Sequence, residues 1–162
     1  MADPLEKELD DLLDAFDKRQ EQRKEVQNAQ TLQEDKFLAD FANFRSKTAR
    51  PLFERVGNHL RQRGHDFDIE EVDYFVDRDG KTTDARISFH LFPMGVNRHE
   101  GQSFPSYAIT ASRGRQIIHL HGSNMLPSGG SFGPRGDFKL DQLSLEVVER
   151  DLLKLLTEVF SK

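Results

Sequence analysis

The sequence predicts an α+β fold: N-terminal helices, a four- to five-stranded antiparallel sheet, and a C-terminal helix packed on one face of the sheet. Three observations lead to this prediction. Residues before position 64 are charged, Gln-rich and poor in apolar side chains, whereas short alternating runs separated by Gly, Asp and Pro follow it. The final segment is strongly amphipathic. We therefore divide the chain into a helical arm or linker, residues 1–31, and a compact α+β domain, residues 32–162.

The first helix is predicted by an apolar stripe with helical spacing. Asp3 can cap this helix, and Pro4 suits its first position because the proline lacks only an N–H that would be unpaired there. The stripe ends after two heptads, since Arg19 and Arg23 occupy the next positions of the pattern. An apolar stripe of only two heptads favours an oligomerisation or docking segment over a long coiled coil. The residues predicted to interact are Leu5, Leu9, Leu12 and Phe16, with Leu13 widening the face.

Residues 17–31 favour a helix by propensity but have little to bury, so they form either a solvated rod or a frayed linker. The apolar stripe resumes at Phe37 and continues to Leu60. Pro51 lies inside this second stripe, and we expect a kink or break near 48–51 because proline disrupts a helix interior. Gly64 is expected to end the helix.

The pattern then changes to a period of two, which is typical of strands. We predict a hairpin with its tip at 77–82, then strands over 85–91, 107–111 and 116–121. Residues 122–137 contain five Gly, two Pro and three Ser and are predicted to be a loop, with a short fifth strand at 138–143. The expected inner face is Val72, Tyr74, Val76, Ala85, Ile87, Phe89, Leu91, Tyr107, Ile109, Ile118 and Leu120.

The last helix begins after Ser144, a good N-cap residue. Its wide apolar stripe should cover the inner face of the sheet together with the helix at 37–63. We expect its charged residues, Asp151 among them, to face water. The stripe is formed by Val147, Val148, Leu152, Leu155, Leu156, Val159 and Phe160.

The composition restricts the class of protein. The 162 residues contain no Cys, which excludes disulfides and thiolate chemistry and suits a reducing compartment. The N-terminus does not resemble a signal peptide, and no apolar run approaches the length of a membrane span, so we expect a cytoplasmic protein without membrane contact. The formal net charge of −5 argues against bulk attraction to nucleic acid.

Three histidines, His90, His119 and His121, are predicted on the polar face of the sheet. Imidazoles from neighbouring strands can bind a divalent metal such as zinc, although no carboxylate is predicted beside them. Solvated histidines on a polar face are the simpler interpretation. His59, His65 and His99 lie beside a helical stripe or in predicted loops and are weaker candidates.

The charges are segregated along the chain. Residues 3–14 carry six acids and one Lys, and residues 66–79 carry seven acids and one Arg. Between them, residues 45–63 carry six bases and one acid, Glu54. Such a basic helix can bind phosphates, but the acidic segments can also neutralise it. The candidate binding residues are Arg45, Lys47, Arg50, Arg55, Arg61 and Arg63.

No phosphate-binding loop, nucleophile elbow or metalloprotease motif is present, and Arg135 in the Gly-rich segment 129–136 is only a weak anion-binding candidate. We therefore predict no catalytic residue and no cofactor. The leading hypothesis is a non-enzymatic interaction or adaptor module that self-associates through its N-terminal helix. A nucleic-acid-binding protein and a metal- or ligand-binding domain remain the alternatives.

Overall fold

The computed structural model describes residues 3–98 and 101–161. The chain divides into two compact units, Met1–Lys36 (the first unit) and Phe37–Lys162 (the second unit). The described residues have the predicted α+β architecture, with a five-stranded antiparallel sheet and helices before and after it. The elements are α1 (Pro4–Phe44), η1 (Arg45–Ala49), α2 (Arg50–Gln62), β1 (Asp66–Val72), β2 (Phe75–Val76), β3 (Thr82–Thr83), β4 (Ala85–Phe92), β5 (Ser106–Ser112), β6 (Ile117–Ser123), β7 (Phe132–Phe138), η2 (Leu140–Gln142) and α3 (Leu145–Phe160).

The first unit is helical from Pro4 onward, including residues 17–31. The predicted cap at its start is confirmed, because the Leu5 N–H donates to Asp3 Oδ1 at 3.1 Å. Every residue from 3 to 33 is exposed. This unit therefore holds its helix without a core of its own.

The predicted interruption near Pro51 is a π-helical turn, η1, between α1 and α2. The Arg50 N–H donates to the Arg45 carbonyl five residues back, one residue farther than in an α-helix. This wider turn comes just before Pro51, which cannot donate a backbone hydrogen bond and would crowd the carbonyl of Lys47 in a regular helix. The end of α2 is as predicted, with Gly64 at a φ of +95°.

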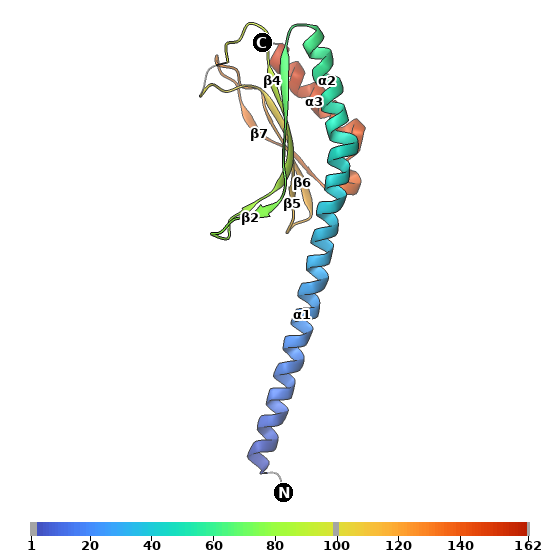
Figure 1. Cartoon of the computed structure of the whole chain (residues 1–162), viewed down its shortest axis with the longest axis vertical. Coiled ribbons are helices and arrows are strands. Elements are labelled where there is room, and N and C mark those ends of the chain that lie inside the picture. The colour runs from blue at the N-terminus through green and yellow to red at the C-terminus, as the bar shows by residue number, and fades with distance from the viewer. Residues whose placement is uncertain (1–2, 99–100, 162) are drawn as a thin grey trace. The chain divides into compact units, whose positions relative to one another are not determined.

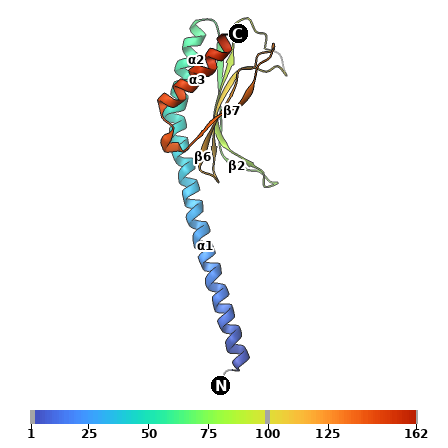
Figure 2. The same ribbon diagram turned by 180° about the vertical axis from the view of Figure 1, so that it is seen from behind.

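The sheet of the second unit has the strand order β1-β4-β5-β6-β7, so strands that are consecutive in the sheet are antiparallel neighbours. Helices α2 and α3 lie over the same face of this sheet (Figures 1 and 2). The core lies between these layers, and its innermost side chains include Phe41, Phe53, Phe89, Tyr107 and Leu152. The predicted covering of the inner face by the two helices is confirmed.

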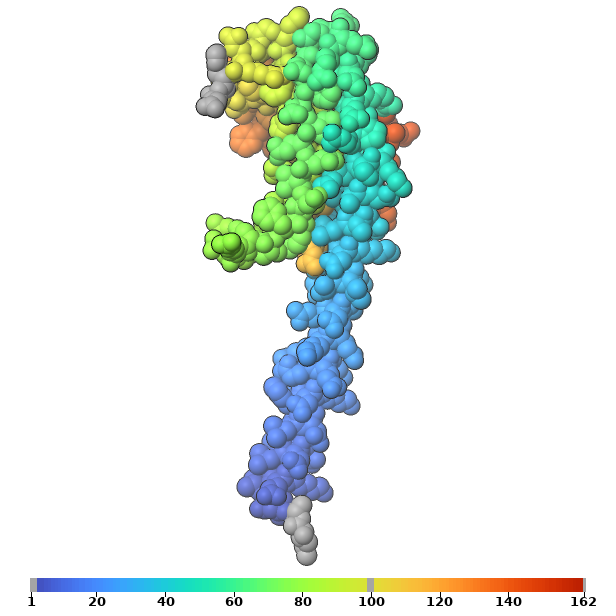
Figure 3. All heavy atoms as spheres, viewed as in Figure 1, coloured from blue at the N-terminus to red at the C-terminus, as the bar shows by residue number. Residues whose placement is uncertain are grey.

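The prediction for the first strand was wrong by one residue in register. Val72 pairs with Arg86 on the polar face, whereas Phe67 and Ile69 pair with Leu91 and Phe89 on the inner face. A shift of one residue moves each side chain to the other side of a sheet. Val76 was also misplaced, because it is exposed in β2. The β2–β3 hairpin has the predicted tip and protrudes from the second unit (Figure 3).

The Gly-rich segment was also predicted wrongly, because much of it forms the last strand of the sheet. Strand β7 runs through Pro134 and pairs with β6, with an irregularity in register between Leu120 and His121. Proline is tolerated here because β7 is an edge strand and needs hydrogen bonds on one side only. The predicted strand at 138–143 is instead the end of β7 and the short helix η2.

Candidate functional site

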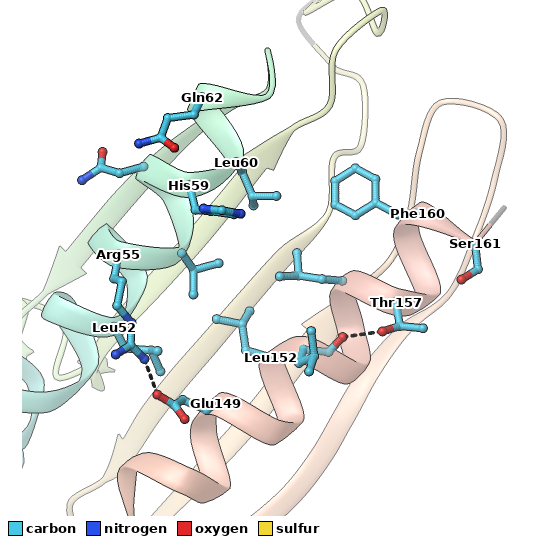
Figure 4. Close-up of a pocket in the computed structure, with 14 residues that line it drawn as sticks. Leu52, Arg55, His59, Leu60, Gln62, Glu149, Leu152, Thr157, Phe160 and Ser161 are labelled. Carbon is cyan, nitrogen blue, oxygen red and sulfur yellow. Dashed lines mark hydrogen bonds and ion pairs between the residues drawn. The ribbon is translucent and has the colours of Figure 1, made fainter.

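A groove with a volume of about 1010 Å³ lies between α2 and α3 (the α2–α3 groove; Figure 4). Both helices belong to the second unit, so the groove lies within one compact body. The apolar side chains that line it are Leu52, Val56 and Leu60 of α2 and Leu152, Leu153, Leu156 and Phe160 of α3.

The groove exists because each helix carries an apolar face wider than the sheet alone can cover. On α2, Gly57 lies against β1 so closely that a Cβ there would come within 2.5 Å of the Phe67 ring. On α3, Val148 and Leu155 are fully buried, whereas Leu153 and Phe160 are 65% and 44% exposed. Leu153 is therefore largely open to water, and Phe160 is partly so although its ring centroid lies 4.9 Å from that of His65.

Polar groups close the groove at one end and line its rim. Arg55 of α2 forms an ion pair with Glu149 of α3 across the groove (Figure 4). On the α3 side, Thr157 Oγ1 donates to the Leu153 carbonyl at 2.8 Å, which satisfies its hydroxyl within the helix. His59 lies on the opposite wall. The charged groups at this site thus neutralise each other, while the apolar lining remains accessible.

The predicted interaction residues lie along one stripe of the first unit. In the structure Leu5 is 61% exposed, Leu9 48%, Leu12 62% and Phe16 49%. Contiguous exposed apolar side chains of this kind typically mark an interaction site. We call these four residues the apolar stripe.

The basic residues of 45–63 are mostly paired with acids of the same chain. Arg45 donates to Asp73 Oδ1 at 2.5 Å and to the Val72 carbonyl at 3.0 Å. Arg50 lies 3.0 Å from a carboxylate oxygen of Glu54. These contacts neutralise charge that could otherwise bind phosphate.

Arg61 pairs with Asp66 at 2.9 Å. This bond holds the pKa of Asp66 below its ordinary value, and the backbone N–H of Phe67 lowers it further. Within the described chain, Lys47 and Arg63 make no ion pair. Nucleic-acid binding by this helix stays a prediction.

The three sheet histidines share the polar face but lie on two strands that are not neighbours. The rings of His119 and His121 on β6 are 6.4 Å apart, whereas His90 is on β4, with β5 between the two strands. His119 Nδ1 lies 2.6 Å from Asp137 Oδ1, and the histidine lowers the pKa of that carboxyl. Residues 3–98 and 101–161 contain no group of three His, Cys, Asp or Glu side chains placed to hold a metal ion. His99 lies outside the described residues. Metal binding stays a prediction.

One polar cluster was missed in the sequence. Tyr107, on the inner face of β5, donates to Asp151 Oδ2 at 2.8 Å, and Arg135 of β7 donates to Asp151 Oδ1 at 3.2 Å. Arg135 also contacts Glu158 at 3.1 Å. Burial raises the pKa of Tyr107 and the Asp151 charge raises it further, which keeps the phenol protonated.

This cluster corrects two expectations. Only 20% of the Asp151 side chain is exposed, and Arg135 is held by two carboxylates instead of being available to an anion. Burial alone would lower the pKa of Arg135, but Asp151 and Glu158 outweigh this effect and raise it. The cluster fastens α3 to β5 and β7. No local pattern in the sequence indicates this cluster, because it depends on residues 132–138 forming a strand in place of the predicted loop.

No protein-family model matches this chain, and no curated protein or solved structure matches it either. Among the described helices, none combines the length and the apolar character needed to cross a membrane. The function must therefore be argued from the surfaces themselves.

Proposed function

We propose that this protein is a non-enzymatic interaction module that self-associates through the apolar stripe of its N-terminal helix. The observation that carries the proposal is the exposure of Leu5, Leu9, Leu12 and Phe16 on a helix that has no core in its own unit. A helix with these residues gains stability when the stripe is buried against another surface.

The chain itself supplies a reason to choose a second copy as the partner. The first unit has an unpartnered apolar stripe, and the second unit has an apolar groove on its α2–α3 face. Two copies of the chain can bury both surfaces without any other protein. Self-association therefore accounts for the apolar stripe and the α2–α3 groove together.

The mass of the 162-residue protein in solution tests this proposal. We expect multi-angle light scattering to give at least twice the 18.7 kDa of one chain. The double variant Leu9→Glu with Leu12→Glu should have the mass of a single chain, because two carboxylates in the stripe oppose its burial. Val26→Glu is the matched control, since Val26 is exposed on the same helix outside the stripe. A single-chain mass for the unaltered protein across the micromolar range would reject self-association.

A further inference from the structure

We propose that the α2–α3 groove of one chain binds the apolar stripe of a second copy of the chain. This inference rests on the proposed function and adds to it the surface that receives the stripe. Each contact joins two different surfaces, because a helix of one copy meets a groove of the other. Exchange of stripes between two copies fills both grooves and gives a closed dimer.

The charges of the first unit disfavour the simplest alternative, in which two stripes pair with each other. Residues 3–14 carry six acids and one Lys, so two aligned stripes bring together two segments of net charge −5 each. Like charges on neighbouring helices destabilise their pairing. Arg19 and Arg23 occupy the next two positions of the apolar pattern. In a parallel pair of helices, each of these arginines would therefore also lie opposite the same arginine of the other copy. The stripe therefore needs a receiving surface that is not another stripe.

The α2–α3 groove has the chemistry that such a helix requires. Helix-in-groove recognition uses apolar anchors at spacings of three and four residues, laid into an apolar cleft. The stripe provides anchors at spacings of four, three and four. The groove provides a floor of buried side chains, Leu52 and Leu152, flanked by the exposed Leu153 and Phe160. The anchors and the lining are of the same apolar kind, so both lose water on contact.

The groove is close to neutral, whereas the stripe is acidic. The groove lining holds one Arg and one Glu, Arg55 and Glu149, and these two side chains form an ion pair. Acidic residues flank the stripe on both sides, with Glu6 and Glu8 next to its first anchors. The stripe therefore meets no unpaired acid among the groove-lining residues, in contrast to the pairing of two acidic stripes.

The lengths also match. From Leu5 to Phe16 the stripe covers about 16 Å of helix, and the groove follows α2 from Leu52 to Gln62 over about 15 Å, at 1.5 Å per residue. The stripe and the groove are therefore of nearly equal length, so the stripe can lie along the groove.

Two full-length variants test the proposal by complementation. The stripe variant carries Leu9→Glu and Leu12→Glu and keeps its groove. The groove variant carries Leu153→Glu and keeps its stripe; Leu153 is 65% exposed, so its replacement leaves the core intact. Leu145→Glu is the matched control, because Leu145 is also exposed on α3 but does not line the groove. Circular dichroism and the midpoint of thermal unfolding establish that each variant is folded.

We expect sedimentation velocity to show that each variant alone self-associates at least about tenfold more weakly than the unaltered protein. The Leu145→Glu control should associate normally. A mixture of the two variants should form complexes, since the stripe of the groove variant fits the groove of the stripe variant. Fluorescence anisotropy can follow this mixture if Arg78→Cys is added to the groove variant, because the chain has no other Cys to take the label.

The outcomes separate this inference from the proposed function. If the unaltered protein is a single chain, both fail together. If the groove variant associates as strongly as the unaltered protein while the stripe variant does not, the stripe pairs elsewhere; self-association stands and the groove inference is overturned. The groove inference is also overturned if both variants are monomeric and their mixture binds no more tightly than either variant alone.

Discussion

In the first unit, Leu9 and Phe16 lie on a helix on which each residue from 3 to 33 is exposed, whereas in the second unit Phe41 and Phe53 are fully buried beneath a sheet. Both pairs belong to helical apolar stripes, the first over residues 5–16 and the second over residues 37–60. They differ in what the surrounding chain offers, because residues 66–160 supply a sheet and a third helix for the second stripe to pack against. An amphipathic pattern thus specifies a face to be buried, but not the partner that buries it.

The two units therefore depend on different forces. The second unit has a buried hydrophobic core, and polar contacts such as the Tyr107–Asp151 hydrogen bond link α3 to the sheet. The helix of the first unit relies on propensity, its capping residue and association, and isolated helices are marginal in water. Four measurements test this difference between the two units.

Hydrogen exchange should show the largest difference. In dilute solution, where the chain is a monomer, amides of residues 5–33 should exchange at least about a thousandfold faster than those of β4 and β5, which open only when the domain unfolds. Exchange of residues 5–16 should slow as concentration rises and the stripe is buried. Equal protection of both units in the monomer would refute the contrast.

A core truncation should show the next largest effect. Phe53 is fully buried, and its ring centroid lies 5.6 Å from that of Phe89 and 6.1 Å from that of Tyr107. Phe53→Ala should lower the free energy of unfolding by about 3–5 kcal/mol, because it removes contacts and leaves a cavity. Urea unfolding of the monomer measures this loss.

Leu9→Ala is the control for that measurement. It should change the free energy of unfolding of the second unit by less than about 0.5 kcal/mol, as expected for an exposed position. A similar loss for both variants would mean that the first unit contributes to the same cooperative transition.

Much of this contrast could be predicted from the sequence. The wide stripe of α3 and its Ser144 cap, whose hydroxyl accepts the Val147 N–H at 3.3 Å, are local features. The turn at Asp77 is also local, since its carboxylate accepts the N–H groups of Asp79 and Lys81. Such signals lie within a few residues of the structure they specify, so they survive without knowledge of the fold.

The failures lie where tertiary pairing overrides local pattern. The alternating pattern placed Val72 on the inner face, but Phe67 and Ile69 define the buried face of β1. Pro134 suggested a loop, but an edge strand tolerates it. The Arg135–Asp151 pair depends on the position of β7, so it could not be found before the strand was. The α2–α3 groove could not be predicted either, because it arises from the spacing of two helices that are distant in the chain.

The hydrogen bond between Tyr107 and Asp151 should contribute less to the free energy of unfolding than the packing of the core. Tyr107→Phe removes the hydroxyl that donates to Asp151 and should lower the free energy of unfolding by about 1–2 kcal/mol. Tyr74→Phe is the matched control, because Tyr74 lies at the margin of the core and makes no such contact with Asp151. If the two variants unfolded at the same urea concentration, the Tyr107–Asp151 bond would not stabilise the second unit.

The smallest effect should be the dependence of the free energy of unfolding on pH in the acidic range. Arg86 lowers the pKa of Glu70, Arg61 lowers that of Asp66, and His119 lowers that of Asp137. A carboxyl whose pKa is lower in the folded state binds protons more readily when unfolded, so it stabilises the folded state above its ordinary pKa. That contribution is lost as the pH falls from the ordinary values of 4.5 for Glu and 3.8 for Asp through the lower folded ones.

The unfolding midpoint of the second unit in urea should therefore fall as the pH is lowered from 6 towards 3, and the slope should be shallower in the triple variant Asp66→Asn, Glu70→Gln and Asp137→Asn. All three carboxyls are at least partly exposed, so water and salt weaken their ion pairs and each change is small. Added salt should flatten the slope of the unaltered protein towards that of the variant, because it screens the Arg86–Glu70 and Arg61–Asp66 pairs. If the slope were equally steep in the variant, the dependence of stability on pH would come from groups other than Asp66, Glu70 and Asp137.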